Sequence, residues 1–154
     1  MHENPRPDRT ATPIELIEQL ARVAAAYYRH FAAAAAGHGL TLMQGKTLSL
    51  LTRPRSMRGL AGLLSCDASN VTGIVDRLEA RDLVLREPDP SDRRVKNIAL
   101  TEHGERTVRL IRADLMSGLT ALEALTAEDR GALRSLLDRA FPETTSAAYR
   151  ALPG

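Results

Sequence analysis

The hydrophobic periodicity of this 154-residue chain changes abruptly in one place, and that change restricts the folds open to it. Residues 68–81 have the spacing of a helix with one buried face. The apolar positions that repeat at three and four residues are Val71, Ile74, Val75 and Leu78. Residues 83–87 are instead short and β-prone, residues 88–92 are turn formers, and residues 93–100 return to the β-prone pattern. The pattern predicts a helix followed directly by a two-stranded hairpin with a long tip.

Helical patterns surround this unit on both sides. Before it, we expect a long helix from Thr12 to about Ala36 and two short helices. After it, we expect a helix with a continuous apolar seam and a last helix that ends at Pro142. The seam comprises Val108, Ile111, Leu115, Leu119 and Leu122. The residues placed to cap the helices at their N-termini are Thr12, Thr41, Ser56, Asp67, Thr101 and Thr126.

Composition excludes several classes of protein. No apolar run approaches the roughly 18 residues of a membrane helix, so no membrane partner is expected. Residues 1–13 are polar and contain three prolines, which excludes a signal peptide and predicts a flexible arm over residues 1–11. The single cysteine, Cys66, excludes an intrachain disulfide and a multi-cysteine metal site. We therefore expect a cytoplasmic protein without a metal or cofactor.

The order of the central elements predicts a DNA-binding fold. The order is that of a winged helix-turn-helix: a short helix, a tight turn, a second helix with a polar outer face and a hairpin with a basic tip. The expected class is therefore mainly α with a small β-wing. A helix fits the major groove, and Arg at a hairpin tip fits the narrow minor groove. Taken alone, the polar face is also compatible with a solvated helix. The net charge is only +2, but residues 41–100 carry ten positive and seven negative charges.

The hairpin and the helix before it resemble the MarR family. The stretch from Asp92 to Thr101 matches that family's wing signature: an Asp, any residue, an Arg, five residues, then Leu-Thr. The stretches 69–72 and 75–79 look like its recognition helix, and residues 101–104 also fit. The resemblance implies a homodimeric bacterial transcription regulator that binds a pseudo-palindromic double-stranded DNA operator. Repression, with release by a small-molecule effector, is the expected mode.

The resemblance also implies roles for individual residues. The residues expected to contact DNA are Ser56, Ser69, Asn70, Thr72, Gly73, Arg77, Arg93, Arg94 and Lys96. Asp92 is expected to orient the wing by pairing with an Arg. The family usually has a Gly after the recognition helix, because the chain needs a left-handed residue there. This chain departs from that pattern and has Asp82 instead. It departs again at Gly73, which either allows close approach to DNA or reflects simple drift.

The long flanking helices predict a dimer and a regulated site. The resemblance implies that residues 12–37 and 102–154 interlock across a two-fold axis, with residues 40–101 as the DNA-binding lobe. The candidates to line an effector pocket are Tyr27, Tyr28, Phe31 and His38, although the aromatic residues are also suited to the dimer core. Cys66 is expected to be a buried structural residue rather than a redox sensor.

Two other classes of protein remain as alternatives. An enzyme is disfavoured because we find neither a nucleophile–base signature nor a Gly-rich phosphate loop. A protein–protein module on a winged-helix scaffold is the second alternative. Such a module can lose its basic wing tip, whereas this chain retains Arg93, Arg94 and Lys96.

Overall fold

The computed structural model describes residues 10–145; residues 1–9 of the expected arm and residues 146–154 of the expected tail lie outside this part. The elements in chain order are α1 (Pro13–Gly37), α2 (Leu42–Leu50), β1 (Arg55–Ser56), α3 (Met57–Leu64), α4 (Ala68–Glu79), β2 (Val84–Pro88), β3 (Lys96–Leu100), α5 (Glu102–Ser117), α6 (Thr120–Ala124), α7 (Ala127–Ala140) and the 3-10 helix η1 (Pro142–Thr145). None of the described helices is long and apolar enough to cross a membrane.

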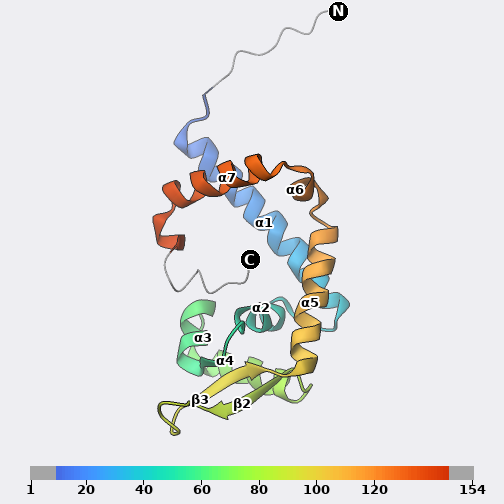
Figure 1. Cartoon of the computed structure of the whole chain (residues 1–154), viewed down its shortest axis with the longest axis vertical. Helices are drawn as coiled ribbons and strands as arrows, with labels where there is room; N and C mark the ends of the chain where they lie inside the picture. Colours follow the sequence, from blue (N-terminus) through green and yellow to red (C-terminus); the bar gives the residue numbers. More distant parts are fainter. Residues whose placement is uncertain (1–9, 146–154) are drawn as a thin grey trace, which may run out of the picture.

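The elements form two parts joined by α5 (Figure 1). The lower lobe contains α2, α3, α4 and an antiparallel three-stranded sheet in the order β1-β3-β2. The upper arch contains α1, α6 and α7, and α5 runs from the lobe to the arch. Within the sheet, Val84 lies opposite Leu100 and Arg55 lies opposite Ile98. The predicted class, mainly α with a small β-wing, is confirmed.

The hydrophobic core lies in the lower lobe. Its largest fully buried apolar side chains are Leu48, Leu60, Leu78, Leu83, Ile98, Ile111, Val71, Val75 and Val84. Helix α1 reaches this core only at its C-terminal end, where Phe31, Ala34 and Ala35 are buried. Helix α7 contributes no buried residue. The lobe therefore has an interior of its own, whereas much of the arch has none.

Local side-chain contacts begin most of the helices where the sequence predicts. The hydroxyls of Thr12, Thr41 and Thr126 each accept a hydrogen bond from the third helical amide, and a side chain at that position reaches back to the cap. Ser56 and Thr101 accept equivalent bonds at the starts of α3 and α5. Asp67 occupies the N-cap of α4, but its carboxylate makes no capping hydrogen bond. The predicted helix starts are thus confirmed.

Three details differ from the sequence prediction. The expected two-stranded hairpin gains a third strand, because β1 pairs with β3. Helix α4 ends at Glu79 rather than near residue 81. The expected continuous helix also breaks at Gly118, so that Leu119 caps α6 and Leu122 lies within it. A Cβ at Gly118 would lie 2.8 Å from Nδ1 of His30, so the break lies where α1 and the end of α5 approach closely.

The turn after α4 has the left-handed conformation that the sequence predicts. Asp82 has a φ of 54°, and the amides of Asp82 and Leu83 donate to Glu79 and Leu78 at 2.9 and 3.0 Å. Thr101 then donates its hydroxyl proton to the Asp82 carbonyl at 2.6 Å. The turn therefore directs the chain from α4 into β2 and is attached to the start of α5.

Candidate nucleic-acid interface

Helix α4 presents a polar face that no other described element covers. Ser69, Asn70 and Thr72 are exposed, and the side chains of Ser69 and Asn70 form no hydrogen bond within residues 10–145. The Thr72 hydroxyl donates to the Ala68 carbonyl at 2.9 Å and retains its acceptor capacity. No atom lies within 4 Å of a Cβ placed on Gly73. The buried face of the same helix, which includes Val71 and Leu78, fixes this polar face outwards.

An arginine of the wing holds the acidic residues of α4. The Arg86 guanidinium on β2 donates to the Asp76 carboxylate at 2.5 Å and also bonds Glu79 one turn later. Arg77, between these two acids in the sequence, is exposed and forms no ion pair within the described chain. Arg86 therefore crosslinks the wing to α4 and leaves Arg77 available for an external partner. Sequence reasoning missed Arg86, because its partners lie on another element.

The tip of the wing is organised by Asp89. Its carboxylate accepts hydrogen bonds from the Ser91 amide at 2.8 Å, the Ser91 hydroxyl at 2.5 Å and the Asp92 amide at 3.1 Å. The buried side-chain amide of Asn97 donates to the other carboxylate oxygen at 2.8 Å. These bonds hold the pKa of Asp89 well below its usual range, and those from the Ser91 and Asn97 side chains contribute most. Asp89 thus ties both ends of the loop together.

Asp92 acts differently from the sequence prediction. Its carboxylate accepts a hydrogen bond from the backbone amide of Arg94 at 3.0 Å, and it forms no ion pair with an arginine side chain within residues 10–145. The expected guanidinium pair is thus not formed in the described part of the chain, where the tight turn brings the backbone amide of Arg94 to the carboxylate. Arg93, Arg94 and Lys96 are exposed and have no acidic partner in the described part of the chain. The wing tip thus presents three free cations.

Ser56 lies at the edge of the sheet, where its hydroxyl already accepts the Gly59 amide at 3.1 Å. Arg53, also exposed and missed by sequence reasoning, lines a hollow of about 440 Å³ together with Ser56 and residues of the wing tip such as Asp89. Burial lowers the pKa of the neighbouring Arg55, and the positive charge of Arg53 lowers it further. Two arginines around a proline, just before a helix cap, are the sequence signal that points to this cationic edge.

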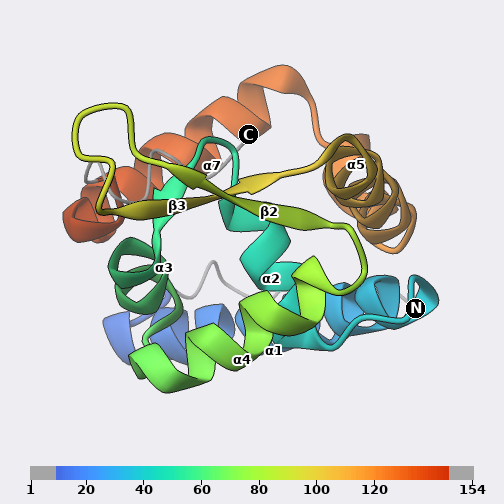
Figure 2. The same cartoon turned by 90° about the horizontal axis from the view of Figure 1, so that it is seen from below.

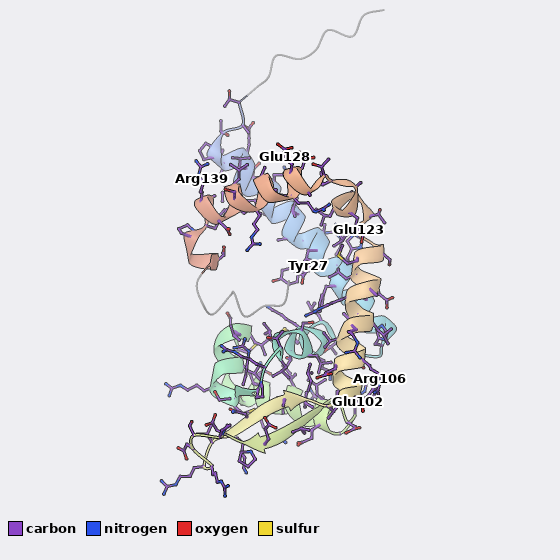
Figure 3. The ribbon with its side chains drawn as sticks, viewed as in Figure 1. Tyr27, Glu102, Arg106, Glu123, Glu128 and Arg139 are labelled. Atoms are coloured by element: carbon purple, nitrogen blue, oxygen red, sulfur yellow. The ribbon has the colours of Figure 1, made fainter. Side chains whose placement is uncertain are left out.

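The four candidate effector residues do not share one site. Tyr27, Tyr28 and Phe31 line a cavity of about 380 Å³ together with Lys46 and Ser49. Figure 3 shows Tyr27 on α1. Burial, with a smaller contribution from Tyr28, raises the pKa of Tyr27. His38 does not line this cavity, and its Nε2 lies 2.8 Å from the Asp114 carboxylate.

Two polar groups distinguish the cavity from a simple packing defect. The Ser49 hydroxyl oxygen is buried and has no hydrogen-bond partner within the described residues. The Lys46 ammonium lies 5.8 Å from the centre of the Tyr28 ring. A buried hydroxyl without a partner is energetically costly, so this wall of the cavity is suited to a polar group of a bound molecule.

The half-buried Cys66 packs against the core, and its thiol donates to the Leu64 carbonyl at 3.3 Å. These contacts agree with a structural role, although Cys66 is less buried than expected.

Comparisons with known proteins agree with this geometry. The model of the MarR family matches residues 40–96. The HTH-type transcriptional repressor NicR of Pseudomonas putida is 39% identical over 99 residues, which span 60% of this chain and 63% of NicR, just under two thirds. Among solved structures, CouR from Rhodococcus jostii RHA1 bound to p-coumaroyl-CoA is 31% identical with a TM-score of 0.69, covering 86% of this chain and 96% of CouR. A MarR-family transcriptional regulator from Rhodococcus sp. RHA1 is 30% identical with a TM-score of 0.67, covering 86% and 99%.

Proposed function

We propose that this chain, which belongs to the MarR family of transcription regulators, is a homodimeric repressor that binds a pseudo-palindromic DNA operator and is released by a small molecule. One observation carries the proposal. Helix α4 and the β2–β3 wing both lie on the side of the molecule seen in Figure 2, and these two elements carry the exposed polar residues and the exposed cations described above. This family assignment also separates the chain from enzymes.

The two parts of this surface have different tasks on DNA. Helix α4 enters the major groove, where Asn70 has the geometry to read adenine and Ser69 and Thr72 bond base edges or phosphates. The open space at Gly73 permits close approach of the backbone. Arg94 enters the minor groove, and the other DNA-contacting residues hold the sugar-phosphate backbone. These are Arg77, Arg93, Lys96, Ser56 and, added from the structure, Arg53.

Exposed apolar residues in the arch support a dimer. Helix α1 exposes 64% of Ile14 and 50% of Ile17, and α7 exposes 57% of Leu136. An apolar hollow of about 670 Å³ lies between α1, α6 and α7. A second copy that covers these residues would place two α4 helices about one DNA turn apart. We accordingly assign residues 12–37 and 102–145 to the dimer and residues 40–101 to DNA.

The cavity beside Tyr27 is the proposed effector site. CouR, a solved relative, is bound to p-coumaroyl-CoA, a molecule with both an aromatic ring and charged groups. The cavity in this chain likewise combines the aromatic rings of Tyr27, Tyr28 and Phe31 with the Lys46 ammonium and the Ser49 hydroxyl. Binding there acts on α1 of the arch and on α2 of the lobe, which together line the cavity.

Fluorescence anisotropy on the DNA upstream of the protein's own gene tests this proposal. Affinity is expected to fall steeply with salt, with a logarithmic slope of about 0.9 for each phosphate contact. Arg94→Ala should cost about 1–3 kcal/mol of binding free energy if Arg94 is a specific contact. Arg139→Ala removes the same charge from α7 and should leave binding unchanged. Equal binding by Arg94→Ala and the wild type would remove Arg94 from the interface.

A further inference from the structure

The turn between α1 and α2 is held from two sides by side chains that the proposed DNA contacts do not use. The Arg81 guanidinium donates one hydrogen bond to the Gly39 carbonyl at 2.6 Å and another to the His38 carbonyl at 3.0 Å. On the other side, the His38 ring lies 2.8 Å from the carboxylate of Asp114 on α5. This short turn therefore connects residues that follow α4 with both α1 and α5.

The electrostatics of α1 explain why Arg81 is held there. The C-terminal end of a helix carries partial negative charge, and α1 has no basic residue in its last turn. The amides of His38 and Gly39 bond back to Ala35 and Ala36, which leaves their own carbonyls pointing away from the helix. Arg81 supplies the missing cation, and its planar fork spans both carbonyls.

Arg81 is itself fixed to the end of α4. It is the second residue after Glu79, the last residue of α4, and its amide donates to the Leu78 carbonyl at 3.2 Å. The next two residues are held by the left-handed conformation of Asp82 and by complete burial of Leu83. A displacement of the turn at residues 38–39 would therefore act on the end of α4 through the Arg81 side chain, which is bonded to the turn at two points.

We infer that Arg81 is a positioning residue that ties the recognition helix α4 to the helices of the arch and so sets the angle of α4 on DNA. The inference rests on the proposed DNA-binding function and concerns its regulation. Helix α1 carries Tyr27, Tyr28 and Phe31 of the proposed effector cavity and ends at the turn that Arg81 holds. The link thus gives effector binding a direct connection to α4.

Arg81→Ala and Arg81→Lys test the inference in anisotropy titrations on operator and random DNA across a salt series. Arg81→Ala should weaken operator binding by about tenfold and leave random-DNA binding and the salt slope unchanged. Arg81→Lys should be intermediate, because an ammonium keeps the charge but does not span both carbonyls. Arg139→Ala, with the same loss of charge on α7, is the matched control. A salt slope reduced by about one phosphate contact would instead make Arg81 a backbone contact and overturn the inference.

A double-mutant cycle with Asp114→Asn tests whether the turn carries the coupling. If both contacts act through residues 38–39, the combined loss of operator affinity should be smaller than the product of the single losses. Independent losses would overturn the link. Hydrogen exchange of the free protein supplies a readout without DNA: amides of residues 78–83 should exchange faster in Arg81→Ala than in Arg139→Ala. A wild-type chain that binds no operator would overturn the proposed function, whereas operator binding unchanged in both Arg81 variants would overturn only the link.

Discussion

The lower lobe and the upper arch differ in how far they bury their apolar residues. In the lobe, side chains such as Leu60, Leu78 and Ile98 are completely buried within one chain. In the arch, Ile14, Ile17 and Leu136 remain at least half exposed. Burial of one large apolar side chain stabilises a protein by about 1.5–3 kcal/mol, so exposure on this scale is costly unless another surface covers it. The contrast supports the proposal that a second copy of the chain covers the arch, whereas the lobe already buries its apolar residues within one chain.

The largest expected effect tests whether a second copy completes the arch. Leu136→Asp should dissociate the dimer, because each residue of a two-fold interface occurs twice and the loss is about 3–6 kcal/mol for the pair. Light scattering with size-exclusion chromatography measures this. Ser135→Asp adds the same charge about 100° around α7 and is the control. A wild type that is monomeric at micromolar concentration would contradict the proposed dimer.

A slightly smaller effect tests the interior of the lobe. Ile98→Ala should lower the free energy of unfolding by about 2–5 kcal/mol, because Ile98 is completely buried on the central strand. Urea denaturation measures the change. Val95→Ala on the same hairpin, where 39% of the side chain is exposed, should change stability much less. Similar losses of stability for both variants would mean that Val95 is buried by a surface outside this chain.

A pH experiment tests the part of the lobe that polar contacts hold. Since folding lowers the pKa of Asp89, the ionised carboxylate stabilises the fold above its unfolded pKa of about 3.9, and this stability is lost as pH falls below that value. Asp89→Asn should therefore melt at a lower temperature than the wild type at pH 7. The difference should shrink as the pH falls from 4 towards 2. A constant difference would mean that the charge of Asp89 contributes nothing.

The smallest expected effect concerns the turn that joins α4 to β2. Asp82→Gly should be neutral or stabilise the fold by up to about 1 kcal/mol, because Gly adopts the left-handed conformation without the steric cost that Asp bears. Thermal melting measures the change. A clear loss of stability would reveal a contact of the Asp82 side chain that outweighs this cost.

The sequence predicted the features that depend on contacts between neighbouring residues and missed those that depend on contacts between residues distant in the sequence. Helix starts at Thr41 and Thr126 were predictable, because a capping side chain and its amide are three residues apart. The pairing of β1 with β3 was not, because Arg55 and Ile98 are distant in the sequence and β1 has only two residues. The break at Gly118 was also missed; it lies where the end of α5 approaches His30 of α1, a residue that is distant in the sequence.

The candidate site was predictable in its residue types but not in its internal contacts. The polar face of α4 follows from helical spacing alone. The wing acid was assigned to Asp92, although Asp89 makes more of the contacts that hold the tip. Asp side chains commonly accept a hydrogen bond from the backbone amide two residues later, so the position of Asp89 within the turn formers of residues 88–92 is the local signal for it. The contact between His38 and Asp114 joins two distant helices and has no local signal.

Arg86 has a consequence for how the protein searches a chromosome. By pairing with Asp76 and Glu79, it offsets one of two negative charges that would otherwise repel phosphates beside α4, and its own charge is no longer available to DNA. The surface is left with a few free cations and no large excess of positive potential. If the proposed function holds, we expect such a surface to bind random DNA weakly and to release it quickly. Discrimination between the operator and the many competing sites then depends on the few side chains that meet the right bases.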